Sequence, residues 1–340
     1  MKKFKGVEIV ENLKKKFAGK KALTNLLFIV ISYAIITFLL KGGILNRQYT
    51  SLLVPIAVNI ILAVSLNLIT GFLGELSLGH AGFMSIGAYV GALITINMDA
   101  PEIVELTLAL VAGGAVAAFF GFIIGMPVLR LNGDYLAIVT LGFGEIIKSV
   151  LISMEITNGA KGLQKIPLYT NYKSYTLVFI LMAISIIAIT NIVNSRHGRA
   201  ICSIRDNSIA TESIGINVSR FKVMAFVISA FFAGIAGVLY AHNVGILKPT
   251  TFDYNKSIEI LVIVVLGGMG SIRGSIIAAV ILTALPELLR GADDFRMLLY
   301  AVVLIIIMLF NHSKIKEGLY NNNTIGKLFG KKTDKEKVGE

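Results

Sequence analysis

The polar residues that could do chemistry in this chain stand inside long apolar runs, next to glycines. Residues 71–83 read GFLGELSLGHAGF, which places Glu75, Ser77 and His80 among glycines. In a bilayer, unpaired polar groups and bent backbone must be satisfied inside the protein. The segment therefore predicts a tight inter-helix turn whose Ser and His satisfy backbone groups, or a gate on a transport pathway. We expect no metal at His80, because no second His, Cys or carboxylate stands at ligand spacing.

A charged pair interrupts another apolar run. Glu145 and Lys148 stand three residues apart in DYLAIVTLGFGEIIK, residues 134–148, so they share one helical face and can pair. Charges inside a membrane span normally face the interior of the bundle. Two interpretations stay open: the pair neutralises itself and locks two helices together, or it lines a cavity where its charges meet a zwitterion.

A third motif, LGGMGSIRG at 266–274, breaks the apolar sequence nearer the C-terminus. The run 258–266 would be only about 13 Å long as a helix, well short of the ~30 Å hydrocarbon layer. A broken or re-entrant hairpin and two full spans both fit this pattern. Asn59 and Asn67 are predicted to join helices by hydrogen bonds or to line a cavity. The predicted translocation-pathway residues are Gly74, Ser77, Gly79, His80, Glu145, Lys148, Gly267, Gly268 and Gly270.

The loop 195–222 is too long and too patterned for a minimal connection. Within 200–214, isoleucines alternate with charged residues, and Gly215 offers a helix stop. The pattern predicts a short amphipathic helix at the membrane surface. Its charges have both signs, since Arg205 stands near Asp206 and Glu212. Mixed signs favour a protein groove over an anionic lipid surface, which would favour basic residues alone.

Composition indicates an integral membrane protein. Hydrophobic residues make up 55% of the 340 residues and charged residues 15%, with a mean hydropathy of +0.79; soluble domains have about 25% charged residues. The predicted fold is all-α and polytopic, with about 8–10 transmembrane helices. Ten apolar segments support it, at about 22–40, 50–70, 81–97, 103–129, 135–154, 174–194, 223–243, 257–267, 275–289 and 297–310.

The net charge of +12 predicts topology. Basic residues cluster before the first segment, after the last and in the 195–222 loop, so both termini and this loop are expected to be cytoplasmic. Basic clusters that flank apolar spans fit topology better than nucleic-acid binding. The predicted domains are a basic tail at 1–21, a transmembrane domain at 22–310 and a second basic tail at 311–340.

Four motifs together resemble one family. The chain is similar to the LivM-type inner-membrane permease subunits of branched-chain amino acid ABC importers over roughly 50–310. The motifs are GELSLGHAGF, DYLAIVTLGFGEIIK, IRDNSIATESIGINV and VLGGMGSIRGSI. One departure is Lys161, where an acidic or uncharged residue is commoner in the family.

The resemblance implies a bacterial plasma-membrane subunit with several partners: a second homologous permease, two cytoplasmic ATPases and an extracytoplasmic amino-acid-binding protein. The chain itself has no GxxxxGK[ST] phosphate loop, so we expect ATP and Mg to be used by the partner ATPase and no cofactor to be bound here. By the same likeness a coupling helix would sit in the ATPase groove. Its residues would be Arg199, Arg205, Asp206, Asn207, Glu212 and Gly215.

Other functions remain to be weighed. Urea, short-chain amides or another amino acid could be the cargo of the same kind of permease. An ion-coupled secondary transporter would use Glu145 as its coupling carboxylate. A membrane-embedded enzyme is not expected, because the spans contain no nucleophile–base constellation or metal cluster.

Overall fold

The computed structural model describes residues 47–289, apart from 132 and 171–173. It also describes Tyr33, Thr37, Phe295, Leu298, Ala301, Val302, Leu304 and Ile305. The predicted tails, 1–21 and 311–340, and almost all of the segments 22–40 and 297–310 lie outside these residues.

The described chain is helical, and one isolated antiparallel bridge, Leu163 with Leu247, is its β-structure. The first half comprises α2 (Arg47–Ser51), α3 (Leu53–Asn67), the π-helix η1 (Leu68–Leu73), α4 (His80–Asn97), α5 (Glu102–Val128) and α6 (Asp134–Ser153). The second half comprises the 3-10 turn η2 (Gly159–Lys161), α7 (Tyr175–Asn194), α8 (Arg196–Asp206), α9 (Ser208–Ser213), α10 (Val218–Val244), the 3-10 turn η4 (Pro249–Phe252), α11 (Tyr254–Gly267) and α12 (Ile272–Leu288).

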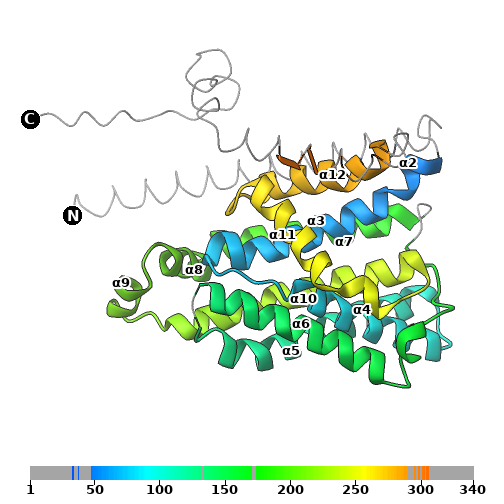
Figure 1. The fold of residues 1–340 in the computed structure, drawn as a ribbon, viewed down its shortest axis with the longest axis horizontal. Coiled ribbons are helices and arrows are strands. Elements are labelled where there is room, and N and C mark those ends of the chain that lie inside the picture. Colours follow the sequence, from blue (N-terminus) through cyan, green and yellow to red (C-terminus); the bar gives the residue numbers. More distant parts are fainter. Residues whose placement is uncertain are drawn as a thin grey trace, which may run out of the picture.

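Five helical stretches among the described residues are long and apolar enough to cross a membrane. They are Tyr49–Leu73, Glu102–Val128, Asp134–Ser153, Tyr175–Asn194 and Val218–Val244. The long helices lie roughly along one axis, and α8 and α9 project from one end of the bundle (Figure 1). This all-α polytopic architecture confirms the predicted fold class.

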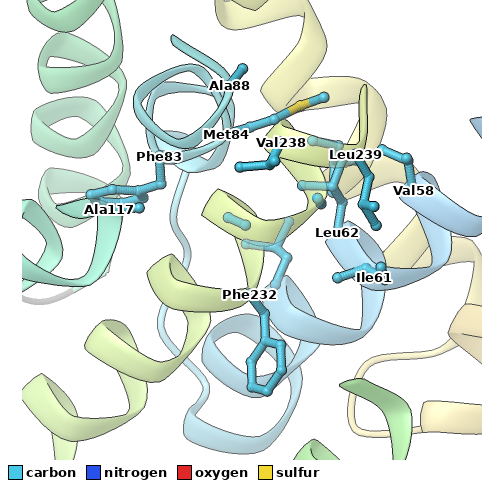
Figure 2. Packing of buried hydrophobic residues seen from close by; sticks show 14 of the residues in the cluster. Val58, Ile61, Leu62, Phe83, Met84, Ala88, Ala117, Phe232, Val238 and Leu239 are labelled. Carbon is cyan, nitrogen blue, oxygen red and sulfur yellow. The ribbon is translucent and has the colours of Figure 1, made fainter. Parts of the chain in front are cut away.

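The core forms where small residues let helices approach closely. α10 packs against α4, α5 and α3. A Cβ on Gly87 of α4 would lie 2.2 Å from the Gly234 carbonyl oxygen of α10, so only glycine fits at this crossing. Buried apolar side chains fill the surrounding space, and Figure 2 shows Met84 near Val238 and Leu239.

Two elements begin inside the bundle instead of at its ends. After η1, residues 74–79 have no regular structure and run back along the bundle to α4 (Figure 1). The first residue of α4, His80, contacts Ser65, which lies eight residues, or about 12 Å, before the end of η1. The Ala81 amide donates to Ser257 Oγ of α11 at 3.0 Å. The starts of α4 and α11 therefore meet within the bundle.

The glycine-rich break near the C-terminus gives a helical hairpin. α11 has 14 residues and α12 has 17, and both are shorter than an ordinary span. Gly268 and Gly270 have positive φ angles of 90° and 80°, which suit glycine at the turn between them. α12 continues through Pro286 to Leu288, close to the end of the predicted segment 275–289.

The single amphipathic helix predicted over 200–214 is in fact two helices. Asn207 separates α8 from α9, and its side chain accepts a hydrogen bond from the Ala210 amide at 3.0 Å, which caps α9. This capping interaction is the physical reason for the bend. Gly215, with φ of +88°, follows the end of α9 as the stop signal predicts.

Candidate functional site

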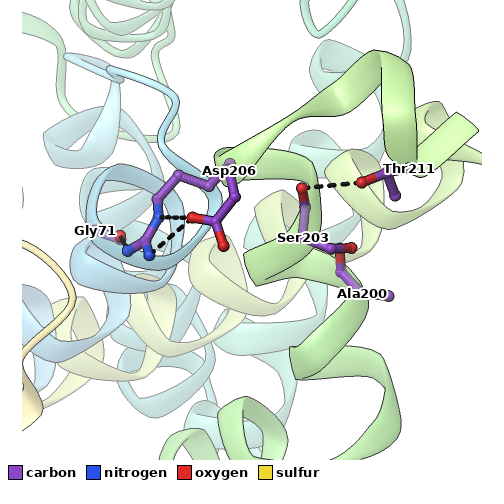
Figure 3. Close-up of polar contacts among 6 residues, drawn as sticks. Gly71, Ala200, Ser203, Asp206 and Thr211 are labelled. Atoms are coloured by element: carbon purple, nitrogen blue, oxygen red, sulfur yellow. Dashed lines mark hydrogen bonds and ion pairs between the residues drawn. The ribbon is translucent and has the colours of Figure 1, made fainter. Parts of the chain in front are cut away.

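The two glycine-rich motifs meet beneath α8. A Cβ on Gly71 would lie 2.2 Å from the Gly270 amide nitrogen, so the two backbones are in contact. Arg205 Nη1 of α8 donates to the Gly71 carbonyl at 2.9 Å, and the space beside Gly74 is filled by the Arg205 side chain. Figure 3 shows Gly71 and Asp206 at this junction. One guanidinium therefore contacts the end of η1 and lies next to the α11–α12 turn.

Amide side chains on α3 hold the same junction together. Asn67 donates to Ser275 Oγ of α12 at 2.9 Å, and its Oδ1 accepts from the Gly270 amide at 2.8 Å. Asn59 donates to Thr283 of α12 at 2.9 Å. The prediction that these two asparagines join helices is confirmed, with α12 as the partner.

The apolar residues of α8 and α9 point in different directions. Ile201 and Ile204 are buried against the bundle, whereas Ile209 is 80% exposed and Ile214 75% exposed. The Thr211 hydroxyl donates to the Ser203 carbonyl at 2.9 Å and fixes α9 onto α8 (Figure 3). The pair therefore has an inner face packed on the bundle and an outer apolar face.

The remaining residues predicted for coupling lie around these helices. Arg199 and Glu212 are exposed, and Arg199 donates to the Asn194 carbonyl. Asp206 pairs with Arg205 at 3.2 Å. Burial raises the pKa of the neighbouring Cys202 thiol, so this thiol is not an activated thiolate.

A buried ion pair lies next to the junction. Glu75 binds Lys222, and both residues are less than 9% exposed. Glu75 belongs to the irregular segment 74–79 and Lys222 to the first turns of α10, directly after α9. A buried pair is costly to break, because the remaining charge has no solvent. The sequence interpretation missed this pair because it treated Lys222 only as a topology signal, and no local spacing connects residues 147 positions apart.

The irregular segment packs tightly against α6 and α3. The Leu78 amide donates to Thr140 Oγ1 at 3.0 Å, and Gly79 lies against the Thr140 carbonyl. His80 is buried and its Nε2 lies 2.9 Å from Ser65 Oγ, so its environment is that of a helix-joining residue. The Ser77 hydroxyl is buried and has no hydrogen-bond partner within the described part of the chain.

The predicted ion pair of α6, Glu145 with Lys148, forms away from the glycine junction. Lys148 Nζ lies 2.8 Å from Glu145 Oε2, and the other carboxylate oxygen of Glu145 accepts from the Tyr254 amide at 3.1 Å. The pair therefore both neutralises itself and joins α6 to the start of α11. It stands apart from the glycine junction, where Gly267 packs on Gly274 and Gly270 on Gly71.

A second ion pair follows directly in α11. Lys256 Nζ lies 3.0 Å from Glu259 Oε2. The sequence interpretation began its segment at 257 and passed over this pair, although the i,i+3 spacing of opposite charges was a readable signal. Within the described ranges, no three His, Cys, Asp or Glu side chains are grouped so that they could hold a metal ion.

Comparison with known proteins places the chain among transport permeases. The family described as "Branched-chain amino acid transport system / permease component" matches residues 48–310. The chain belongs to this family. Its membership and its membrane-spanning helices make it a multi-pass protein of the bacterial inner membrane, and a transport component, not an enzyme.

Several curated proteins are similar to it. The permease protein LivM of a high-affinity branched-chain amino acid transport system is 38% identical in Salmonella typhimurium and 37% identical in Escherichia coli K12. Each match covers 74% of this chain and 66% of the relative, so the chain spans just under two thirds of these relatives. The LivH permease protein of Escherichia coli K12 is 24% identical over 73% of this chain and 88% of its own length. No solved structure gives a significant match to the chain.

Proposed function

We propose that this chain is the LivM-type permease subunit of an ATP-driven, binding-protein-dependent importer of leucine, isoleucine and valine. Two LivM proteins, similar to this chain over 74% of its length, support the cargo. The similarity to LivH supports a second, homologous permease as its membrane partner. Two ATPases would use ATP and Mg, and an extracytoplasmic binding protein would deliver the amino acid.

The outer face of α9 is the single observation that carries the coupling role. Ile209 of α9 and Ile214, directly after it, are exposed beyond one end of the bundle, and Thr211 fixes this short helix to α8. Exposed isoleucines so close together are typical of a docking contact. We propose that they enter a groove of the ATPase. Arg205 would then transmit the movement of α8 to the backbone of both glycine-rich motifs.

The glycine junction would form the gate that this movement opens. Irregular backbone inside a membrane is tolerated where it is buried in protein or lines a polar cavity. Residues 74–79 and the turn at 268–270 are such segments, and both lie next to Arg205. Gly74, Gly267, Gly268 and Gly270 are the pathway residues that this geometry favours.

The test is co-purification of the ATPase with the permease complex, together with ATP-driven leucine uptake in proteoliposomes. Complexes with Ile209→Asp or Ile214→Asp should no longer retain the ATPase or take up leucine, whereas the permease should still insert into the membrane normally. Ile156→Asp is a matched control, because Ile156 is 67% exposed and follows the opposite end of the bundle. It should retain the ATPase.

Charge reversal at Arg205 and Asp206 should abolish uptake even when the ATPase stays bound. Normal uptake by that variant would overturn the coupling assignment. Leucine uptake without any ATPase would instead favour a secondary transporter. Thermal shifts of the binding protein with leucine, urea and short-chain amides would separate the candidate cargoes.

A further inference from the structure

Two ion pairs, here called the charged cluster, lie where α11 begins beside α6. Glu145 pairs with Lys148, and Lys256 pairs with Glu259. The Tyr254 amide, two residues before Lys256, donates to Glu145 and joins the two pairs. The cluster therefore has two carboxylates and two ammonium groups.

The cluster lies within the thickness of the bundle. Glu145 lies about 16 Å along α6 from Asp134 and about 12 Å from Ser153. α11 begins beside Glu145, and Ser257 accepts the Ala81 amide where α4 also begins inside the bundle. Both contacts place the first turns of α11 at the middle level of α6.

The four charges are only partly covered by the chain. The side chain of Glu259 is 44% exposed and that of Glu145 34%, and Lys148 and Lys256 are 21% and 20% exposed. At this depth, hydrocarbon would not solvate them. The exposed face of α5 shows the contrast, because residues 106–129 contain no charged side chain. Partly exposed charges at this level require an aqueous or polar neighbour beside α6 and α11.

We propose that this cluster binds the ammonium and carboxylate groups of an amino acid during its passage. This inference rests on the proposed function and identifies a contact site for the same cargo. Glu259, the most exposed carboxylate, receives the ammonium group, and Lys256 beside it receives the carboxylate. The two charged groups of the zwitterion replace the contact between Glu259 and Lys256. The zwitterion has no net charge, so the net charge of the site stays zero.

The exchange also favours release. Each lysine already has a carboxylate partner, so the bound zwitterion gains only the difference between two similar interactions. Ile258, between the paired residues and 39% exposed, supplies an apolar contact for a branched side chain. A site of this kind is weak and is selective for a molecule with both charges, as a transit site requires.

The experiment uses thiol protection in the reconstituted complex. Cys202 is the single cysteine of the chain, so Cys202→Ser with Ile258→Cys gives one reporter thiol. A membrane-impermeant, charged methanethiosulfonate should label it. With leucine at about ten times its apparent Kd, mass action predicts labelling about tenfold slower. Leucinamide, which lacks the carboxylate, and 4-methylpentanoate, which lacks the ammonium, should each protect far less.

Two variants complete the test. Glu259→Gln in the reporter background should remove leucine protection while the complex assembles normally. Phe119→Cys, at an exposed position of the uncharged α5 face, should not react with the charged reagent. Three results would overturn the proposal: an unreactive reporter thiol at position 258, leucine protection unchanged in Glu259→Gln, or equal protection by both analogues. Leucine uptake by the parent complex is measured separately, so failure of the proposed function is seen independently.

Discussion

Lys222 illustrates how one side chain can depend on a partner far away in the sequence. Its ammonium group is buried against the Glu75 carboxylate, near the start of α10, which follows α9. Removal of either residue takes the opposite charge of this pair away from a buried group. The pair therefore fixes the irregular segment to the base of α10.

Glu75→Gln should lower the free energy of unfolding by about 3 kcal/mol, because the buried ammonium group of Lys222 loses the carboxylate that it binds. Thermal unfolding of the purified protein measures the loss. The exchange Glu75→Lys with Lys222→Glu should recover part of it, since the pair is restored in reverse. Equal stability of Glu75→Gln and the parent protein would contradict the assignment.

Tyr169 gives a pH-dependent prediction at the same scale. Its hydroxyl donates to Glu105 at 2.5 Å, and removal from water together with this hydrogen bond raises the pKa of Tyr169 from 10.0 to about 12. The neutral phenol is thus favoured in the folded state. Its stabilisation is fully present below pH 10.0 and is lost as the pH rises towards about 12.

Thermal unfolding at alkaline pH tests this. The parent protein should lose stability relative to Tyr169→Phe between pH 10.0 and about 12. The two proteins should keep a constant difference below that range. A difference that does not change with alkaline pH would show that Tyr169 keeps its ordinary pKa.

At the level of elements, glycine position decides whether two helices can touch. Gly87 of α4 has no room for a methyl group beside Gly234 of α10, whereas a Cβ on Gly142 of α6 would meet nothing within 4 Å. Both residues stand inside helices. They differ only in what lies next to them.

Gly87→Ala should therefore destabilise the protein by about 1–3 kcal/mol through overpacking. Gly142→Ala should be neutral or stabilise it by up to about 1 kcal/mol, because alanine has the higher helix propensity. Unfolding in a denaturant series compares the two. A similar loss for both substitutions would indicate that α6 is also closely covered at Gly142.

The contrast between local patterns and long-range contacts explains which features the sequence could predict. Apolar runs gave the helices, because length and hydropathy are local properties, and the i,i+3 spacing gave the Glu145–Lys148 pair. The Arg205–Gly71 and Glu75–Lys222 contacts join residues 134 and 147 positions apart, so no local pattern revealed them. The bend at Asn207 was missed because the isoleucine spacing of 200–214 suggested one continuous face.

For the whole molecule, the two ends of the bundle have different characters. α9 precedes the start of α10, whereas η2 lies near Leu163, which pairs with Leu247 beyond the end of α10. Because the 195–222 loop is rich in basic residues, we expect the α9 end to be cytoplasmic and the η2 end to be extracytoplasmic.

Cysteine labelling in intact cells tests this orientation. In the Cys202→Ser background, Lys161→Cys should react with an impermeant maleimide from outside. Ile214→Cys should react only after the membrane is opened, because its side chain is exposed at the end that we expect to be cytoplasmic. The reverse pattern would invert the expected topology and overturn the proposed coupling role of α9.

The hydrogen bonds between α3 and α12 have a consequence for biosynthesis. Asn59 and Asn67 are synthesised 224 and 208 residues before their partners Thr283 and Ser275. The C-terminal hairpin is too short to be retained in lipid one helix at a time. During translation, the side-chain amides of Asn59 and Asn67 therefore lack these α12 partners until the hairpin leaves the ribosome. A chain truncated before α11 would expose these polar groups of α3 to quality-control proteases.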